Sequence, residues 1–407
     1  MSSRGIDKSK GEIPVVDIGP LMDESACPAE RLKAGQMIVD ACARQGVLFA
    51  TGHGISKRQR QLALERAREF FVLPEEAKRR TPAVSGGFTR GYIGFGGESG
   101  SDMLECKEAF SYGFPWPEDS PRTNTLQGPN LWPDVELLGH RWREDMLDLF
   151  RRMVSASEAV TLGVSLGLGL EEDALTKLCR EGDTISLMRL FHYYPYKNED
   201  KKPQVRQDKD ASKPPPPIGT PLSEASEAPQ GECPPDSQPR KTGSSPHTDW
   251  GFLTCILQDA AGGLQFLDQH TGRWADVPCM EEALVVNCGD VLALLTRGRL
   301  TSPVHQVVTT SVERTSFVFF FYPNFHASLR PLVPPGDAAA FDPKMPAVSG
   351  AGEGVVPAPA TPGGALKFNT LLDMADSHSL DSMPFGVRAS PSLPCDVRAV
   401  LLGTAIV

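Results

Sequence analysis

Long apolar runs, paired cysteines and an excess of basic residues are all missing from this chain of 407 residues. No run of 18 apolar residues is present, and residues 1–11 lack the apolar stretch of a secretory signal. The nine cysteines contain no CxxC pair, which disfavours a disulfide framework or a zinc–cysteine site. The formal net charge of -10 disfavours nucleic-acid binding. We therefore expect a cytoplasmic protein with no membrane or nucleic-acid partner, and the sequence leaves its oligomeric state open.

The hydrophobic pattern divides the chain into a helix-rich first part and a strand-rich second part. Apolar residues at helical spacing predict helices over 29–45, 57–71 and 134–165, and 13–18 and 47–51 are typical of strands. From about residue 184, short apolar runs separated by turn residues predict antiparallel strands of a barrel or sandwich. These runs cover 185–194, 252–258, 264–267, 283–287, 291–295, 304–309 and 315–322.

The pattern predicts an α+β fold with a mainly β core that helices buttress. We expect one structural unit, in which an N-terminal region (1–183) packs on a catalytic core (184–407). Two segments of that core, 197–245 and 334–365, are rich in Pro with polar or small residues, and such segments bury too little apolar area to offset their ordering entropy. We interpret both as flexible insertions.

Two histidines and one aspartate are the candidate metal ligands. His247 and Asp249 are two residues apart, so on a strand they point to the same face. We expect the third ligand, His305, to come from a facing strand. Two His and one carboxylate leave further positions open on the metal, which is the arrangement of non-haem Fe(II) oxygenases. His-x-Asp alone is weak support, because it also occurs at ordinary strand ends.

A second group of residues could bind an anion. Arg314 and Ser316 open the strand-like run 315–322 and share one face of it, so a guanidinium and a hydroxyl could together hold a carboxylate. A buried arginine is costly without an anionic partner, and a bound dicarboxylate would supply one. Tyr193, in the run 185–194, could donate its hydroxyl to the same group, although a strand tyrosine is more often a core residue.

At this point the sequence resembles the 2-oxoglutarate/Fe(II) dioxygenases of the isopenicillin N synthase type, over nearly the whole chain outside the two flexible segments. The N-terminal motifs that carry the resemblance are Ile13-Pro14-Val15-Val16-Asp17, Gly46-Val47-Leu48-Phe49-Ala50-Thr51-Gly52-His53-Gly54-Ile55, Phe70-Phe71-Val72-Leu73-Pro74, Arg90-Gly91-Tyr92 and Lys107-Glu108-Ala109-Phe110. The C-terminal motifs are His247-Thr248-Asp249-Trp250-Gly251, Gly262-Gly263-Leu264-Gln265, Val286-Asn287-Cys288-Gly289-Asp290, Gly298-Arg299-Leu300, His305 and Arg314-Thr315-Ser316.

The resemblance implies a double-stranded β-helix, also called a jelly roll, with Fe(II) held by His247, Asp249 and His305. It further implies that Arg314 and Ser316, assisted by Tyr193, bind the distal carboxylate of 2-oxoglutarate. Two positions depart from the family pattern: Phe191 stands where the family often has Asn, and Gln306 where it often has Arg.

The resulting hypothesis is an enzyme that uses Fe(II), 2-oxoglutarate and O2 to hydroxylate or desaturate a small organic molecule, forming succinate and CO2. We expect Arg90, Tyr92 and Lys107 near the substrate entrance and the stretch around Phe368, Asn369 and Leu372 as a lid. The expected pocket lining is Phe191, Phe317, Phe319 and Leu294. Two alternatives stay open: an Fe(II)/O2 oxidase of the same fold that does not use 2-oxoglutarate, and an inactive binding or scaffold protein.

Overall fold

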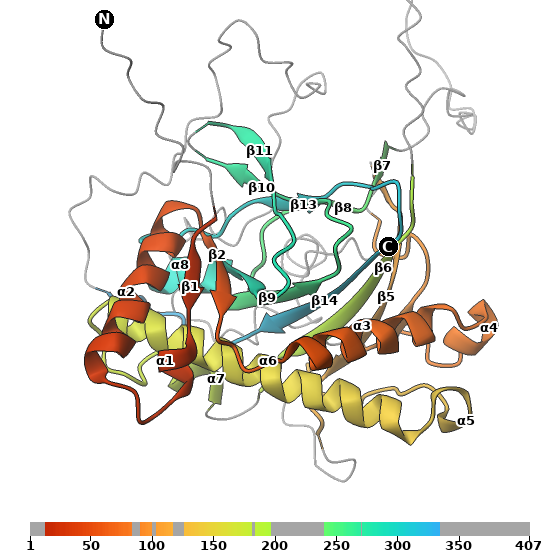
Figure 1. The fold of residues 1–407 in the computed structure, drawn as a ribbon, viewed down its shortest axis with the longest axis horizontal. Helices are drawn as coiled ribbons and strands as arrows, with labels where there is room; N and C mark the ends of the chain where they lie inside the picture. Colours follow the sequence, from red (N-terminus) through yellow and green to blue (C-terminus); the bar gives the residue numbers. More distant parts are fainter. Residues whose placement is uncertain are drawn as a thin grey trace, which may run out of the picture.

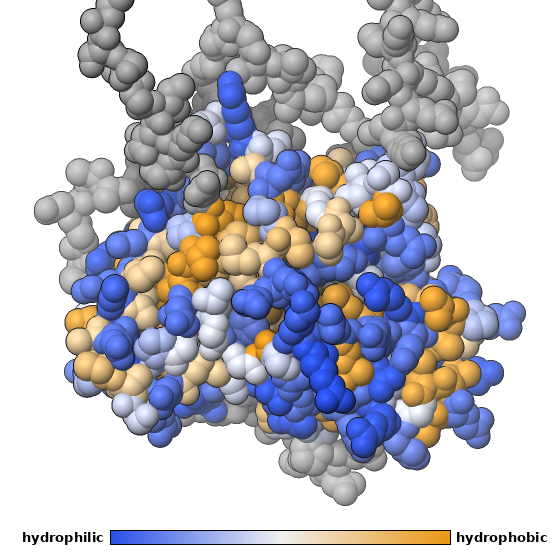
Figure 2. All heavy atoms as spheres, in the orientation of Figure 1, coloured by the Kyte–Doolittle hydropathy of each residue, from blue (hydrophilic) through white to orange (hydrophobic). Residues whose placement is uncertain are grey.

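The computed structural model describes residues 13–83, 90–99, 103–116, 126–180, 184–196, 240–269 and 271–333. Most of the predicted 197–245 insertion, the 334–365 segment and the expected lid around Phe368 lie outside these residues. Among the helices that are described, none has the length and apolar character needed to cross a membrane. Large exposed apolar side chains come from several separate elements, and Figure 2 shows them interspersed with hydrophilic residues.

The helices begin and end where local sequence signals place them. Pro28 opens α2, and Gly46, with a φ of 73°, follows its end, where the absence of a Cβ makes the left-handed region accessible. A capping box between Ser56 and Gln59 opens α3. The helix expected over 134–165 is broken at Gly139. The helices are α1 Gly19–Met22, α2 Pro28–Arg44, α3 Lys57–Phe71, α4 Glu75–Lys78, α5 Val135–Leu138, α6 His140–Gly167, α7 Lys177–Arg180 and α8 Asp290–Leu295.

The strands form two sheets that face each other and one short separate pair (Figure 1). The large sheet has the order β1-β2-β12-β9-β14-β6-β5-β3, the small sheet β11-β10-β13-β8, and β4 pairs with β7. The strands are β1 Val15–Asp17, β2 Val47–Thr51, β3 Gly91–Ile93, β4 Met103–Glu105, β5 Lys107–Gly113, β6 Leu187–Tyr193, β7 Arg240–Thr242, β8 Ser244–His247, β9 Leu253–Gln258, β10 Leu264–Asp268, β11 Arg273–Asp276, β12 Leu284–Cys288, β13 His305–Val307 and β14 Arg314–Phe321.

The large sheet separates two hydrophobic cores. Its outer face packs against the helices, with α6 running along the sheet in Figure 1, and this core includes Trp142, Phe150 and Phe319. Its inner face meets the small sheet, and the core between them includes Phe191 and Phe266. Because side chains alternate along a strand, strands such as β2, β9, β12 and β14 contribute to both cores. The strands that come from the N-terminal region, β1, β2, β3 and β5, are part of this same sheet.

Two sequence expectations are wrong in this region. The apolar run 291–295 lies in α8 and not in a strand, because a short apolar run has no period that distinguishes the two. Phe317, Phe319 and Leu294 do not line the space between the sheets. They belong to the outer core, where the Phe319 ring meets Phe150 of α6 edge-on at 5.1 Å. Alternation requires this outcome, because Arg314 and Ser316 occupy inner positions of β14.

Candidate metal centre

His247 and His305 lie opposite each other on neighbouring strands of the small sheet. His247 ends β8 and His305 begins β13, and the two residues form a direct antiparallel pair. Side chains of such a pair stand on the same face a few ångströms apart, and the two imidazole ring centroids are 4.3 Å apart. The second histidine therefore comes from a hydrogen-bonded neighbour of β8, not from the facing strand that the sequence suggested.

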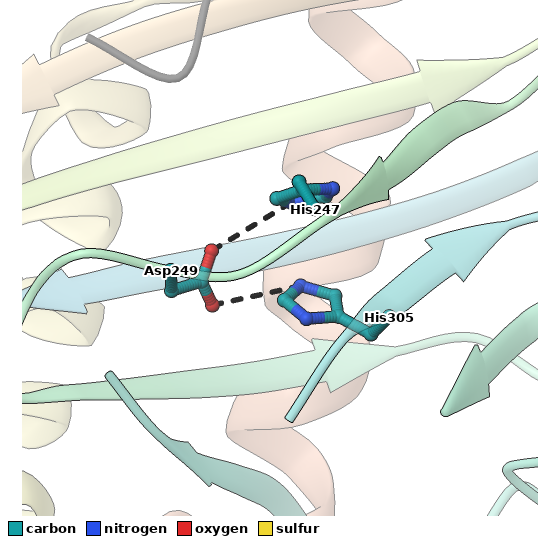
Figure 3. Close-up of side chains that lie close together, drawn as sticks. All are labelled: His247, Asp249 and His305. Atoms are coloured by element: carbon teal, nitrogen blue, oxygen red, sulfur yellow. Dashed lines mark ion pairs between the residues drawn. The ribbon is translucent and has the colours of Figure 1, made fainter. Parts of the chain in front are cut away.

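Asp249 follows the end of β8 and turns its carboxylate toward both imidazoles, with one oxygen facing each ring (Figure 3). The two Asp249 oxygens differ in their partner: Oδ1 lies 3.7 Å from Nε2 of His247, and Oδ2 lies 3.6 Å from Nε2 of His305. One ligand atom from each residue falls within 4.8 Å of the others, close enough to share one ion. The three side chains predicted as ligands are thus brought together, and two His with one carboxylate match the facial triad of non-haem Fe(II) oxygenases.

Backbone and amide groups hold the three side chains in orientation. Nδ1 of His247 lies 2.7 Å from the Ser245 carbonyl oxygen, and Nδ1 of His305 lies 3.2 Å from that of Pro303. A protonated Nδ1 that donates to a carbonyl leaves the Nε2 lone pair free for a metal. Asn287 donates from Nδ2 to Oδ2 of Asp249 at 2.9 Å. Sequence reasoning assigned no role to Asn287, although a fully buried amide inside the apolar strand β12 is a signal of such a contact.

The electrostatics of the centre suit a cation. Burial raises the pKa of Asp249, but the neighbouring His305 and His247 and the hydrogen bond from Asn287 outweigh it and hold this pKa below its usual value. Burial lowers the pKa of His305 to about 4, against the opposing effect of Asp249. The centre therefore presents a carboxylate and a neutral buried imidazole, which are the protonation states that bind a divalent metal.

Arg314 and Ser316 lie on the inner face of β14, in a group of buried polar side chains that has donors without partners. Arg314 is 2% exposed, and it donates from Nη1 to Ser316 Oγ at 3.0 Å and from Nη2 to Gln258 Oε1 at 2.9 Å. Its guanidinium stacks on the Tyr193 ring at 4.7 Å. Within the described part of the chain, Arg314 Nε and Gln258 Nε2 are buried without any hydrogen-bond partner. Such donors are costly unless an acceptor arrives, so the residues present fit a bound carboxylate.

Gln258 is a member of this group that the sequence did not suggest. It pairs with Ser316 across β9 and β14, so its side chain shares the inner face with Arg314. The strand alternation of 252–258 could have placed it there. Of the two departures from the family pattern, Phe191 pairs with Ser316 and fills the inner core with an aromatic ring. Gln306 points to the other face of β13 and donates to Gln265 at 2.8 Å.

The three residues expected near the substrate entrance lie in different places. Lys107 is on the inner face, where its ammonium lies 4.7 Å from the centre of the Phe191 ring. Tyr92 belongs to the outer core, and its hydroxyl forms hydrogen bonds with Glu108 and, at 2.8 Å, with Glu75. Arg90 is buried and donates to the Leu126 carbonyl at 3.2 Å. Of the three residues, Lys107 alone faces the space between the sheets. It lies on β5, which also contributes Ala109 to the inner core.

Comparisons with known proteins agree with this geometry. A family described as the non-haem dioxygenase in morphine synthesis N-terminal region matches residues 13–135, and the 2OG-Fe(II) oxygenase superfamily matches residues 228–323. The chain is 32% identical over 332 residues to the 2-oxoglutarate-dependent dioxygenase citB of Monascus ruber, covering 80% of this chain and 89% of that protein. It is 28% identical to the clavatol oxidase claD of Penicillium crustosum, and the match covers 79% of this chain and 88% of that protein.

Solved structures share the fold. A full-length Neurospora crassa protein, crystallised in complex with alpha-KG, superposes with a TM-score of 0.63 at 21% identity, covering 80% of this chain and 90% of that chain. A putative 2OG-Fe(II) oxygenase family protein from Caulobacter crescentus gives a TM-score of 0.59 at 25% identity, and the match covers 79% of this chain and 90% of that chain. The predicted double-stranded β-helix with buttressing helices is thereby confirmed.

The chain belongs to the 2OG-Fe(II) oxygenase superfamily. It is a non-haem dioxygenase, an oxidoreductase that uses Fe(II), 2-oxoglutarate and O2.

Proposed function

We propose that His247, Asp249 and His305 bind the Fe(II) of this dioxygenase, and that Arg314, Ser316 and Tyr193 hold the distal carboxylate of 2-oxoglutarate. The observation that carries the proposal is the meeting of the three ligand atoms within 4.8 Å on one side of the inner space. The unpartnered donors of Arg314 and Gln258 support the second half. The metal and its co-substrates supply the oxidising chemistry, and the protein supplies their position.

The proposed reaction is hydroxylation or desaturation of a small organic molecule, with succinate and CO2 as co-products. Relatives named for small-molecule oxidation, such as clavatol oxidase and gibberellin 20 oxidase 2 of Oryza sativa, support this substrate class. The aromatic rings of Phe191 and Phe266 in the inner core exclude water from the same region, which protects a reactive centre from side reactions. We also propose a reducing, cytoplasmic location, which the free thiols of the described cysteines support.

Succinate formation tests the proposal directly. Purified enzyme with Fe(II) and 2-oxoglutarate, incubated with a metabolite extract under air, should form succinate in excess of the same sample without extract. His247→Ala should abolish both the excess and the slow background, because it removes one of three ligands. O2 consumption without any 2-oxoglutarate turnover would instead favour the oxidase alternative. Absence of iron and 2-oxoglutarate binding would favour the scaffold alternative, and metal analysis must show that zinc does not occupy the ligands.

A further inference from the structure

Arg60 of α3 is a buried arginine that lies outside the groups described so far. It is 6% exposed, and its guanidinium donates to two backbone carbonyls: from Nη1 to the Ala283 oxygen at 3.0 Å and from Nη2 to the Gln258 oxygen at 2.6 Å. Burial lowers the pKa of Arg60, and this is the largest effect of its surroundings on that pKa. Because an arginine stays charged in proteins, its burial is costly, and the two contacts that accompany it call for an explanation.

The two carbonyls belong to the place where the pairing of β9 with β12 ends. The last residues in register are Val285 and Ile256. The same register, continued by two residues, would set Ala283 opposite Gln258. The fork of Arg60 spans these two residues, so a side chain from the helix layer joins the two strands just beyond their paired part.

The Gln258 side chain connects this end of β9 to the proposed 2-oxoglutarate site. Its Oε1 accepts from Nη2 of Arg314 at 2.9 Å, and Nη1 of Arg314 donates to Ser316 Oγ at 3.0 Å. Gln258 also lies opposite Ser316 in the register of β9 with β14. Gln258 and Arg314 are only 3% and 2% exposed, so both are closely packed. A shift of the Gln258 backbone would therefore move the acceptor that orients the Arg314 guanidinium.

The next residue, Asp259, connects the same strand end to the backbone of β14. Its Oδ2 accepts from the Thr315 N–H at 2.6 Å, and its own N–H donates to the Thr315 carbonyl at 3.1 Å. Thr315 stands between Arg314 and Ser316 in the chain. The end of β9 thus contacts the proposed carboxylate-binding residues twice, and Arg60 is the α3 residue that holds this end.

We propose that Arg60 is a positioning residue for 2-oxoglutarate: it fixes the Gln258 backbone, so that the Gln258 amide orients the Arg314 guanidinium toward the distal carboxylate. The inference rests on the proposed function, because it requires Arg314 to bind that carboxylate. No hydrogen bond or ion pair joins Arg60 directly to Arg314 within the described part of the chain, so its effect passes through Gln258. A purely structural role, in which Arg60 only joins two strands, would lower stability without a specific effect on 2-oxoglutarate.

A double-mutant cycle separates the two roles. The Fe(II)-loaded enzyme is titrated anaerobically with 2-oxoglutarate, and the visible charge-transfer band gives the Kd. Arg60→Met should raise this Kd at least about fivefold, and Gln258→Met roughly tenfold or more, with Fe(II) affinity unchanged in both. In the Gln258→Met background, Arg60→Met should change the Kd by less than about twofold, because the side chain through which it acts has been removed. An unchanged Kd in either folded single variant, or an Arg60→Met effect of the same size in both backgrounds, overturns the inference.

Two further variants serve as controls. Arg66→Met lies on the same helix and removes a contact of 2.8 Å between Arg66 Nε and Asp145 Oδ2. It should destabilise the helix layer yet keep the Kd of 2-oxoglutarate within about twofold of the wild type. Arg60→Lys keeps the charge but replaces the fork with a single ammonium, so its Kd should lie between those of the wild type and Arg60→Met. If Arg60→Met does not fold, a folded Arg60→Lys protein with the wild-type Kd overturns the inference.

The same titrations distinguish a failure of this inference from a failure of the proposed function. A wild-type enzyme that gives no charge-transfer band with Fe(II) and 2-oxoglutarate contradicts the proposed function itself. A normal wild-type band, together with an Arg60→Met titration that matches the wild type, contradicts only the role of Arg60.

Discussion

Replacement of Arg314 by Met should weaken 2-oxoglutarate binding far more than it weakens the fold. Arg314 already donates to Ser316 and Gln258, and its Nε is buried without a partner in the described structure. A bidentate contact to the distal carboxylate comprises two charge-assisted hydrogen bonds, each worth about 1.5–3 kcal/mol. Their loss corresponds to an increase of roughly 10²- to 10⁴-fold in the Kd of 2-oxoglutarate.

The assay for Arg314→Met is an anaerobic titration of the Fe(II)-loaded enzyme with 2-oxoglutarate, followed by the charge-transfer absorption. Fe(II) affinity itself should not change, because no contact joins Arg314 to the three metal ligands in the described structure. The Gln258 acceptor left behind should cost about 1–3 kcal/mol of stability, so thermal unfolding must confirm a folded variant. Arg151→Met, at an α6 side chain that is 67% exposed, is the surface control. A folded Arg314→Met protein with a Kd within about threefold of the wild type would refute the assignment.

Three further outcomes are expected. Asn287→Leu should weaken Fe(II) binding about 10- to 100-fold in a metal titration, because Asp249 loses its orienting donor; unchanged affinity would contradict this role. Phe319→Ala should lower the free energy of unfolding by about 3–5 kcal/mol in urea, whereas Phe95→Ala, at a 52% exposed side chain, should change it by less than about 0.5 kcal/mol. Burial raises the pKa of Glu108, but hydrogen-bond donors led by His192 outweigh burial and hold this pKa at about 2. The ionised Glu108 therefore stabilises the folded state fully above pH 4.5, and this contribution is lost as the pH falls toward 2. Urea unfolding of Glu108→Gln should therefore vary less with pH across that window than that of the wild type, and parallel curves would contradict the assignment.

The sequence predicted the fold best where periodicity and end signals agree. Helix α3, Lys57–Phe71, matches its predicted range, because a capping box marks its start and its apolar spacing is regular. Strand β5, Lys107–Gly113, was not predicted, since buried Lys107 and Glu108 make its sequence look solvent-exposed. Glu108 is neutralised by Lys78, which lies 30 residues earlier in the chain, and a local pattern contains no information about such a partner.

The metal centre likewise has a part that the sequence predicted and a part that it did not. His247, Asp249 and His305 could be chosen from the sequence because they stand in the ordered series of motifs that carries the family resemblance. The contacts that orient these ligands could not be predicted. Asn287 donates to Asp249 because the pairing of β12 with β9 and the turn after β8 bring the two residues together, and neither is visible in the local sequence. The ion pair between Arg189 and Glu98 could not be predicted for a similar reason, since the two residues lie 91 positions apart in the sequence.

Iron-edge anomalous diffraction from crystals soaked anaerobically with Fe(II) is the most direct test of the metal centre. One strong peak should lie within bonding distance of Nε2 of His247, Nε2 of His305 and a carboxylate oxygen of Asp249. The His305→Ala crystal, soaked in the same way, should lose that peak. A peak elsewhere in the wild-type protein, or no peak at all after the same soak, would contradict the assignment of these three residues as iron ligands.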